Sequence, residues 1–88
     1  MKVIHRLVGY DRRTDRMKVR YEIPSGTLVE AKRIAGVASD DPDAAWSYPL
    51  SADQVRAISG LIRAPIDPDR LEFFLEPFAD LGAKSDAE

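Results

Sequence analysis

The sequence predicts a single α+β domain in which an antiparallel β-hairpin packs against three short α-helices. Three observations carry this prediction: apolar residues alternate over 17–23, helix start signals stand at Thr27 and Ser51, and an apolar repeat begins at Leu71. At 88 residues the chain has room for one hydrophobic core. The predicted order of elements is ββα(β)αα, and the bracketed strand, a short edge strand within 45–50, is left open.

The predicted hairpin joins segments 2–10 and 17–23 through the polar run 11–16. Apolar and charged side chains alternate over the second segment, which is typical of a strand with one buried face. The favoured register pairs residues whose numbers add to 27, such as Tyr10 with Met17. A slip by one residue would turn the apolar side chains of the second segment away from the core.

This register has consequences for both faces of the hairpin. Tyr10 and Tyr21 are expected on the core face, with Arg6 opposite Tyr21. On the solvated face, His5 is expected to meet Glu22.

The first helix is predicted from Thr27 to about Ala35. Thr27 with Glu30 three residues later matches a capping box, in which each side chain binds the other's free backbone amide. Gly36 fits the left-handed position that ends many helices.

The second helix is predicted to start at Ser51, where Gln54 completes another capping box. It should stop near Arg63, because Ala64 precedes a proline and is pushed out of the α region. Before it, the edge strand left open contains Pro49, which cannot donate to a ladder and so belongs at a sheet edge.

The third helix is predicted after Asp67, with Pro68 in the first helical position. The apolar residues behind it recur with helical spacing, and Pro77 should end or kink the helix near Glu76. Residues 1–81 are taken as the domain and residues 82–88 as a disordered tail. The apolar repeat consists of Leu71, Phe74, Leu75 and Phe78.

Several kinds of chemistry are excluded or disfavoured by the composition. The chain has no cysteine, which excludes disulfides, thiolate catalysis and cysteine-bound metals, and fits a cytoplasmic protein. No apolar run is long enough for a membrane span, and Arg6 interrupts any signal peptide. His5 is the only histidine and has no second catalytic group beside it, so no enzyme activity is expected.

No cofactor or metal is expected either. The carboxylates Asp40, Asp41 and Asp43 lack the central glycine and closing glutamate of a calcium loop. Ser25-Gly26-Thr27 lacks the lysine and the second glycine of a phosphate-binding loop.

The charge is divided unevenly along the chain, which points to binding. Residues 1–20 hold seven Lys or Arg and two Asp, whereas residues 21–88 hold six basic and thirteen acidic residues. Acidic proteins can recognise basic partners by charge complementarity, and aromatic residues are common interface anchors. The preferred hypothesis is a protein-binding module, such as an adaptor, regulator or immunity-type protein. Its candidate contact residues are Asp40, Asp41, Asp43, Trp46, Tyr48 and Phe73.

The roles of the aromatic residues in this set are left open between core and surface. A core role for Trp46 is favoured, because a domain this small needs large side chains to close its core. If Trp46, Tyr48 and Phe73 share one surface, that surface is a contact site.

Nucleic-acid binding through the hairpin is the alternative hypothesis. The cations could neutralise phosphates, but a core position for both tyrosines would remove the stacking platform, and the pI of 5.4 argues against it. A third hypothesis is self-association, as a homo-oligomeric structural protein. Under the preferred hypothesis, the chain is expected to be a monomer or a weak homodimer. The candidate nucleic-acid-binding residues are Arg6, Arg12, Arg13, Arg16, Lys18 and Arg20.

The sequence also resembles a group of small uncharacterised bacterial proteins of unknown function. The likeness rests on the charged hairpin, a helix ended by glycine, Asp-Asp-Pro, and two longer patterns, and it spans residues 1 to about 80. The resemblance implies no known activity, cofactor or site residue. Some small proteins of this general kind are immunity partners of toxins, which favours the protein-binding hypothesis. The two patterns are Tyr48-Pro49-Leu50-Ser51-x-x-Gln54 and Ile66-Asp67-x-Asp69-x-x-x-Phe73.

Overall fold

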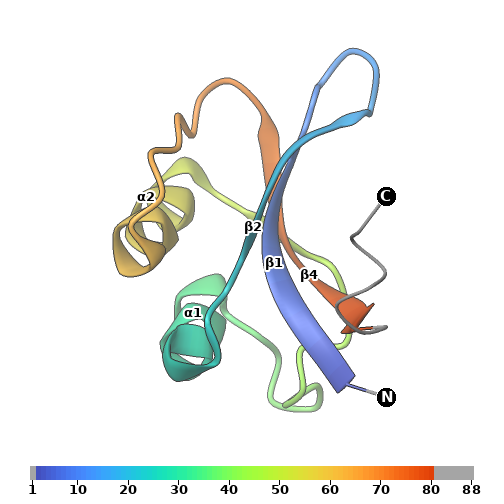
Figure 1. Ribbon diagram of the computed structural model, residues 1–88, viewed down its shortest axis with the longest axis vertical. Coiled ribbons are helices and arrows are strands. Elements are labelled where there is room, and N and C mark those ends of the chain that lie inside the picture. The colour runs from blue at the N-terminus through green and yellow to red at the C-terminus, as the bar shows by residue number, and fades with distance from the viewer. Residues whose placement is uncertain (1, 81–88) are drawn as a thin grey trace.

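The protein folds as one antiparallel sheet with two α-helices on one side, as seen in a computed structural model that describes residues 2–80 (Figure 1). The strands lie in the order β2-β1-β4-β3. A 3₁₀ turn over Ser25–Thr27 precedes the first helix. The elements are β1 (Lys2–Tyr10), β2 (Met17–Glu22), α1 (Leu28–Ala35), β3 (Tyr48–Leu50), α2 (Ala52–Ile62) and β4 (Glu72–Asp80).

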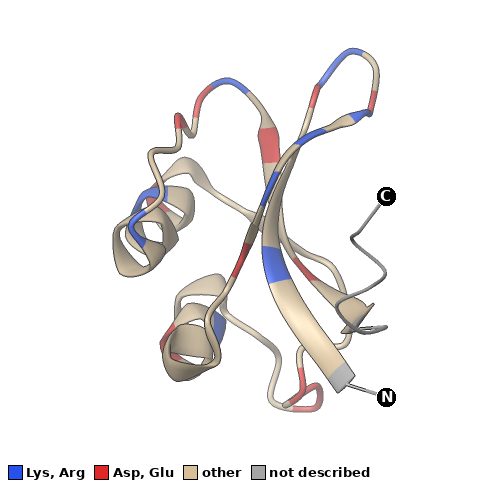
Figure 2. Cartoon of the chain, viewed as in Figure 1, with Lys and Arg blue, Asp and Glu red and all other residues tan. Residues whose placement is uncertain are grey.

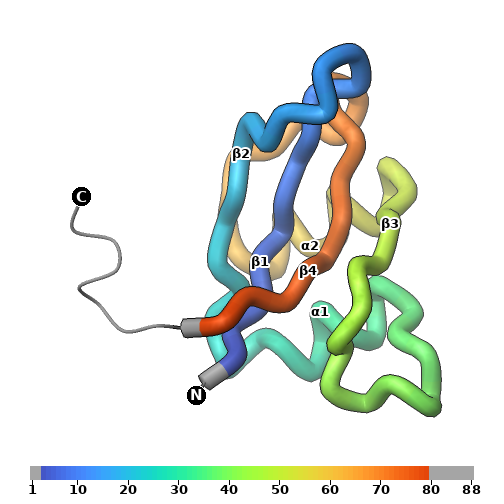
Figure 3. Tube along the Cα trace, turned by 90° about the vertical axis from the view of Figure 1, so that its right-hand side faces the viewer, coloured from blue at the N-terminus to red at the C-terminus, as the bar shows by residue number. Residues whose placement is uncertain are grey.

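Both helices cover the same face of the sheet, and within residues 2–80 no helix covers the other (Figure 3). The uncovered side is called the open face here. The core fills the space between the sheet and the helices. It consists of Leu7, Ile23, Ala31, Ala35, Val55, Ile58, Phe73 and Leu75.

The α+β class is correct, but the predicted third helix is wrong, because residues 72–80 form β4 between β1 and β3. A central strand can be apolar on both faces, and such a run matches helical spacing by chance. Phe73 and Leu75 face the helices and are buried, whereas Phe74 and Phe78 alternate onto the open face. The short edge strand left open by the sequence is present as β3, with Pro49 at its centre.

Pro77 explains how a proline fits into this central strand. It lies opposite His5, whose carbonyl oxygen accepts a hydrogen bond from Ile23 N on the β2 side. Because antiparallel hydrogen bonds alternate between the two sides of a strand, the nitrogen of Pro77 points toward β3, not β1. β3 begins only at Tyr48, opposite Leu75, so Pro77 removes no bond from either ladder.

The predicted hairpin register is also wrong over most of its length. Pairs add to 28, as in Leu7 with Tyr21, and return to 27 only where Tyr10 meets Met17. The shift between Gly9 and Tyr10 leaves Lys18 as an extra residue in β2, which is a β-bulge. Uniform alternation could not reveal this bulge.

The corrected register exchanges the faces of several side chains. His5 and Leu7 face the helices and are buried, although the sequence placed His5 on a solvated face. Tyr10 lies on the open face, whereas Tyr21 faces the helix side opposite Leu7.

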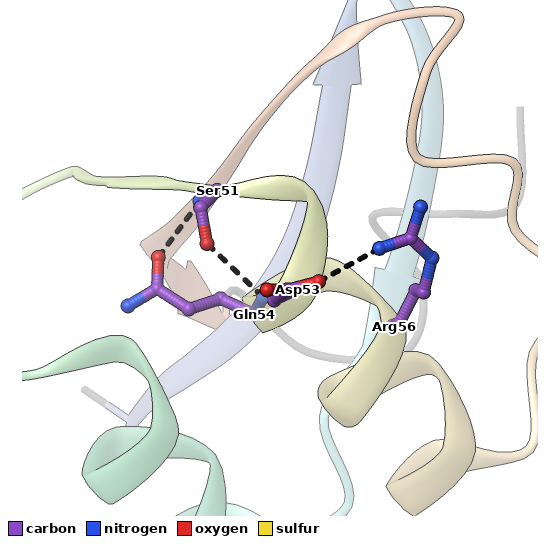
Figure 4. Close-up of polar contacts among 4 residues, drawn as sticks. All are labelled: Ser51, Asp53, Gln54 and Arg56. Atoms are coloured by element: carbon purple, nitrogen blue, oxygen red, sulfur yellow. Dashed lines mark hydrogen bonds and ion pairs between the residues drawn. The ribbon is translucent and has the colours of Figure 1, made fainter.

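Only one of the two predicted capping boxes forms. Ser51 Oγ accepts from Gln54 N at 3.2 Å, and Gln54 Oε1 accepts from Ser51 N at 2.7 Å, so α2 begins as predicted (Figure 4). At α1 the Thr27 hydroxyl donates to the carbonyl of Pro24, and Glu30 pairs with Arg33 instead. The 3₁₀ turn satisfies the start of α1 in place of the side-chain cap.

The ends of the helices agree with the sequence analysis. Gly36 ends α1 with φ of 72°, and α2 ends at Ile62, next to Arg63. No helix within residues 2–80 is long and apolar enough to cross a membrane. The predicted tail, 82–88, lies outside the described residues.

Candidate functional site

The loop between α1 and β3 is organised around one buried carboxylate, that of Asp41. Its Oδ1 accepts from Ala45 N at 2.9 Å, and its Oδ2 accepts from Trp46 N at 3.3 Å and from the Tyr48 hydroxyl at 2.6 Å. The Tyr48 hydrogen bond is the main cause that lowers the pKa of Asp41 below its ordinary value, and the same bond raises the pKa of Tyr48. Asp41 therefore holds the loop in shape and is not free to contact a partner.

Two side chains from other elements tie this loop to the domain. His5 on β1 is 5% exposed, and its Nε2 lies 3.1 Å from the carbonyl oxygens of both Asp43 and Ala44. Because both neighbours are acceptors, Nε2 carries the proton and donates to them. Lys32 on α1 donates to the carbonyl of Pro42 at 2.9 Å. The loop is thus held from the sheet and from the helix.

Trp46 is presented to solvent by this rigid loop. Its backbone N–H is bound by Asp41, while its side chain is 70% exposed. The next residue, Ser47, donates to Glu76 on β4 at 2.9 Å and so fixes the other side of the tryptophan. A large aromatic ring on a fixed backbone loses little conformational freedom on binding, which is typical of an interface anchor.

A cleft of about 640 Å³ adjoins the loop. Its walls are mostly apolar, and charged groups stand at Lys32 and Asp43. The cleft lies between β1, α1 and the end of β4. Its lining includes Val3, His5, Leu28, Lys32, Asp43 and Phe78.

The candidate contact residues therefore divide into two groups. Asp40, Asp43 and Trp46 are exposed on the loop. The expectation of a core role for Trp46 is wrong, because the tryptophan turns outward where the Asp41 hydrogen bonds set the loop.

The other candidates lie inward. Phe73 is 3% exposed and belongs to the core on the helix side of β4, so the described structure does not present it to a partner. Tyr48 is half-buried and donates to Asp41. The surface that Trp46, Tyr48 and Phe73 were to share does not form.

His5 is the contributor that sequence reasoning missed. The wrong register placed it beside Glu22 on a solvated face, whereas it is buried and anchors the loop. The signal available was its spacing in the strand, two residues before Leu7, which places both side chains on one face.

The basic hairpin forms a second surface. Its loop is ordered by Asp11, whose Oδ1 accepts from Arg13 N at 2.8 Å and from Thr14 N at 3.1 Å. These backbone hydrogen bonds lower the pKa of Asp11. Figure 2 shows the basic residues along the hairpin, away from the helices. The exposed cations here are Arg12, Arg13, Arg16, Lys18 and Arg20.

Asp41 makes the fold sensitive to acid. The pKa of Asp41 is lowered from 3.8 in the folded chain. Its contribution to stability is therefore present when the pH is above its pKa in the unfolded chain, and it is lost as the pH falls through its pKa in the folded chain. We expect Asp41→Asn to unfold at lower urea than the native chain near pH 7, and the gap to narrow below about pH 4. Circular dichroism during urea titration at several pH values measures this.

Asp43→Asn, an exposed change in the same loop, is the control and should leave the midpoint nearly unchanged. A gap between the native chain and Asp41→Asn that stays constant down to about pH 3 would contradict this role of the carboxylate.

Comparison with known proteins agrees with the resemblance noted in the sequence. Neither the curated proteins nor the solved structures give a match. A family model described as a domain of unknown function, DUF7683, matches residues 4–76, which include all of β2, α1, β3 and α2 and most of β1. The chain therefore belongs to the DUF7683 family, whose function is unknown.

Proposed function

We propose that this chain is a small protein-binding module, and that it binds a basic partner through the loop 40–46. The exposed Trp46 ring on a backbone fixed by Asp41 is the observation that supports this proposal most strongly. Asp40 and Asp43 stand beside it, exposed, and supply negative charge. Carboxylates of this kind raise the rate of encounter with a cationic protein.

The adjoining cleft gives the surface a place for an apolar side chain of the partner. Its apolar walls include Val3 and Leu28, and Asp43 lies at its border. An apolar anchor with charged groups around it matches the usual arrangement of a protein interface, with a dry centre and a polar rim. We place the module in the cytoplasm, on the ground that it contains no cysteine.

The test is to capture partners from the host with the tagged chain and to titrate the captured protein in solution. Trp46 is the only tryptophan, so its fluorescence reports on this surface in the native chain, and isothermal titration calorimetry measures the affinity of the variant that lacks it. Trp46→Ala is expected to weaken binding by about tenfold or more, since exposed aromatic anchors often contribute 2 kcal/mol or more. Val29→Ala, at a side chain 81% exposed on α1, is the matched control.

Charge reversal tests the acidic part of the surface. Asp40→Lys with Asp43→Lys is expected to slow association and to abolish its dependence on salt. Asp67→Lys with Asp69→Lys changes the net charge equally in the connection before β4 and should have a much smaller effect. Equal effects of the two pairs, or a partner that binds Trp46→Ala as tightly as the native chain, would sink the proposal.

A further inference from the structure

The open face of the sheet carries aromatic side chains on its two central strands. Tyr10 on β1 and Phe74 on β4 pack edge to face, with ring centroids 5.7 Å apart and an angle of 75°. Phe78 lies further along β4, and the guanidinium carbon of Arg6 sits 4.7 Å from its ring centroid. All three rings are half-buried, so each keeps part of its surface in solvent. Figure 3 looks onto this face.

The hairpin beside this face has an excess of positive charge, since residues 10–20 hold five Lys or Arg against Asp11 and Asp15. Among residues 2–80, ion pairs occur at Arg33 with Glu30 and at Arg56 with Asp53, and both lie on the helices. Arg12 donates to the carbonyl of Leu71 at 3.4 Å, which directs it to the end of β4 nearest Tyr10. Within residues 2–80, no hairpin cation forms an ion pair with a carboxylate of either helix.

One feature argues for a single strand over a duplex, and a second argues for nucleic acid in general. An exposed sheet with aromatic rings offers stacking positions for bases, and stacking needs bases that are unpaired. A basic loop at one end of the same sheet offers contacts for phosphates. The sequence-based objection placed both Tyr10 and Tyr21 on the core face; the bulge at Lys18 accompanies a register that puts Tyr10 on the open face, whereas Tyr21 stays on the helix side.

Three carboxylates of the open face limit where such a strand can lie, those of Glu72, Glu76 and Glu22. Glu72 is exposed directly opposite Tyr10. Glu76 on β4 accepts from the Tyr10 hydroxyl at 3.0 Å and from Ser47, so its charge is partly balanced by hydrogen bonds. Glu22 lies opposite Arg6, at the end of β2 far from the hairpin loop. Phosphates are thus favoured near the loop and bases over Tyr10 and Phe74.

We propose that the open face and the hairpin loop together bind single-stranded nucleic acid, by stacking bases on Tyr10 and Phe74 and pairing phosphates with the hairpin cations. This site is separate from the loop 40–46. It is a binding activity that stands whether or not the protein-binding proposal holds.

Fluorescence anisotropy with labelled oligouridine and oligothymidine of about ten nucleotides, and with a duplex of equal length, tests the site. Both single strands are expected to bind more tightly than the duplex. Neutralising about three phosphates gives a logarithmic salt slope of about −2, so binding should weaken about 16-fold between about 50 and 200 mM salt. No binding of either single strand at the lower salt, or preference for the duplex, would overturn the proposal.

Matched variants separate this site from general charge effects. Arg13→Ala with Arg16→Ala should weaken binding and flatten the salt slope, whereas Arg33→Ala with Arg56→Ala removes two charges from the helices and should not. Equal losses of affinity in the two double variants would contradict the assignment of the phosphate contacts to the hairpin cations.

A second comparison tests stacking. Tyr10→Leu should weaken binding by at least about fivefold, and Tyr10→Phe, which keeps the ring, should bind like the native chain. Circular dichroism confirms that each variant is folded before it is compared. Native affinity in a folded Tyr10→Leu chain would overturn the stacking half of the proposal.

Discussion

Replacing Phe73 by alanine is expected to lower the free energy of unfolding by about 3–5 kcal/mol. The ring is 3% exposed and packs in the core between β4 and the helices. Alanine would leave a cavity that the neighbouring strands can fill only in part. Since domains of ordinary size have about 5–15 kcal/mol of stability in total, the variant should be partly unfolded at 37 °C. Urea denaturation followed by circular dichroism measures the loss.

Phe74→Ala is the matched control, because it removes the same ring one residue away. Phe74 is half-buried on the open face, so its loss should cost clearly less than that of Phe73. Equal costs for the two variants, or a Phe73→Ala chain as stable as the native one, would show that the two faces of β4 are assigned wrongly.

Gly9→Ala is expected to cost about 1–3 kcal/mol, because an added methyl group overfills the core. A Cβ at this position would lie 2.7 Å from Cε1 of Phe73 and 2.9 Å from side-chain atoms of both Leu71 and Val19. Three neighbours would have to move at once: Val19 on β2, Phe73 on β4, and Leu71 just before β4. The same urea titration measures this cost.

Gly60→Ala gives a control of opposite sign. Gly60 lies in α2, and a Cβ there meets nothing within 4 Å, so alanine should stabilise the helix by about 0.5–1 kcal/mol. Gly9→Ala should also cost less in a Phe73→Leu chain, since the nearest obstacle is then smaller. Destabilisation of equal size at Gly9 and Gly60 would contradict a packing cause.

Two local signals in the sequence were reliable, whereas a third, the capping box predicted at Thr27, does not form. The capping box of Ser51 and the glycine end of α1 depend on neighbours within a few residues, and both are present. The identity of β4 depends on its place between two other strands, which periodicity does not report. The apolar repeat over residues 71–78 fits a helix and a strand that is apolar on both faces equally well.

The candidate site was only half predictable for a related reason. The acidic and aromatic composition of the loop 40–46 was visible, but which side chains turn inward depends on hydrogen bonds made after folding. Asp41 and Asp43 are identical in type and two residues apart, yet one is buried and the other exposed. His5 contacts the loop at Asp43, which lies 38 positions away in the sequence, and no local pattern encodes such a contact.

The bulge at Lys18 has a consequence for how the chain behaves at high concentration. Central strands that are apolar on both faces, like β4, favour stacking into fibres when a sheet edge is long and regular. β2 forms one edge of this sheet, and its extra residue breaks the repeat of outward amide and carbonyl groups that an incoming strand would pair. β3, at the opposite edge, is three residues long and contains Pro49. Each edge thus resists strand addition by a different device, so the sheet is protected from growing into an aggregate.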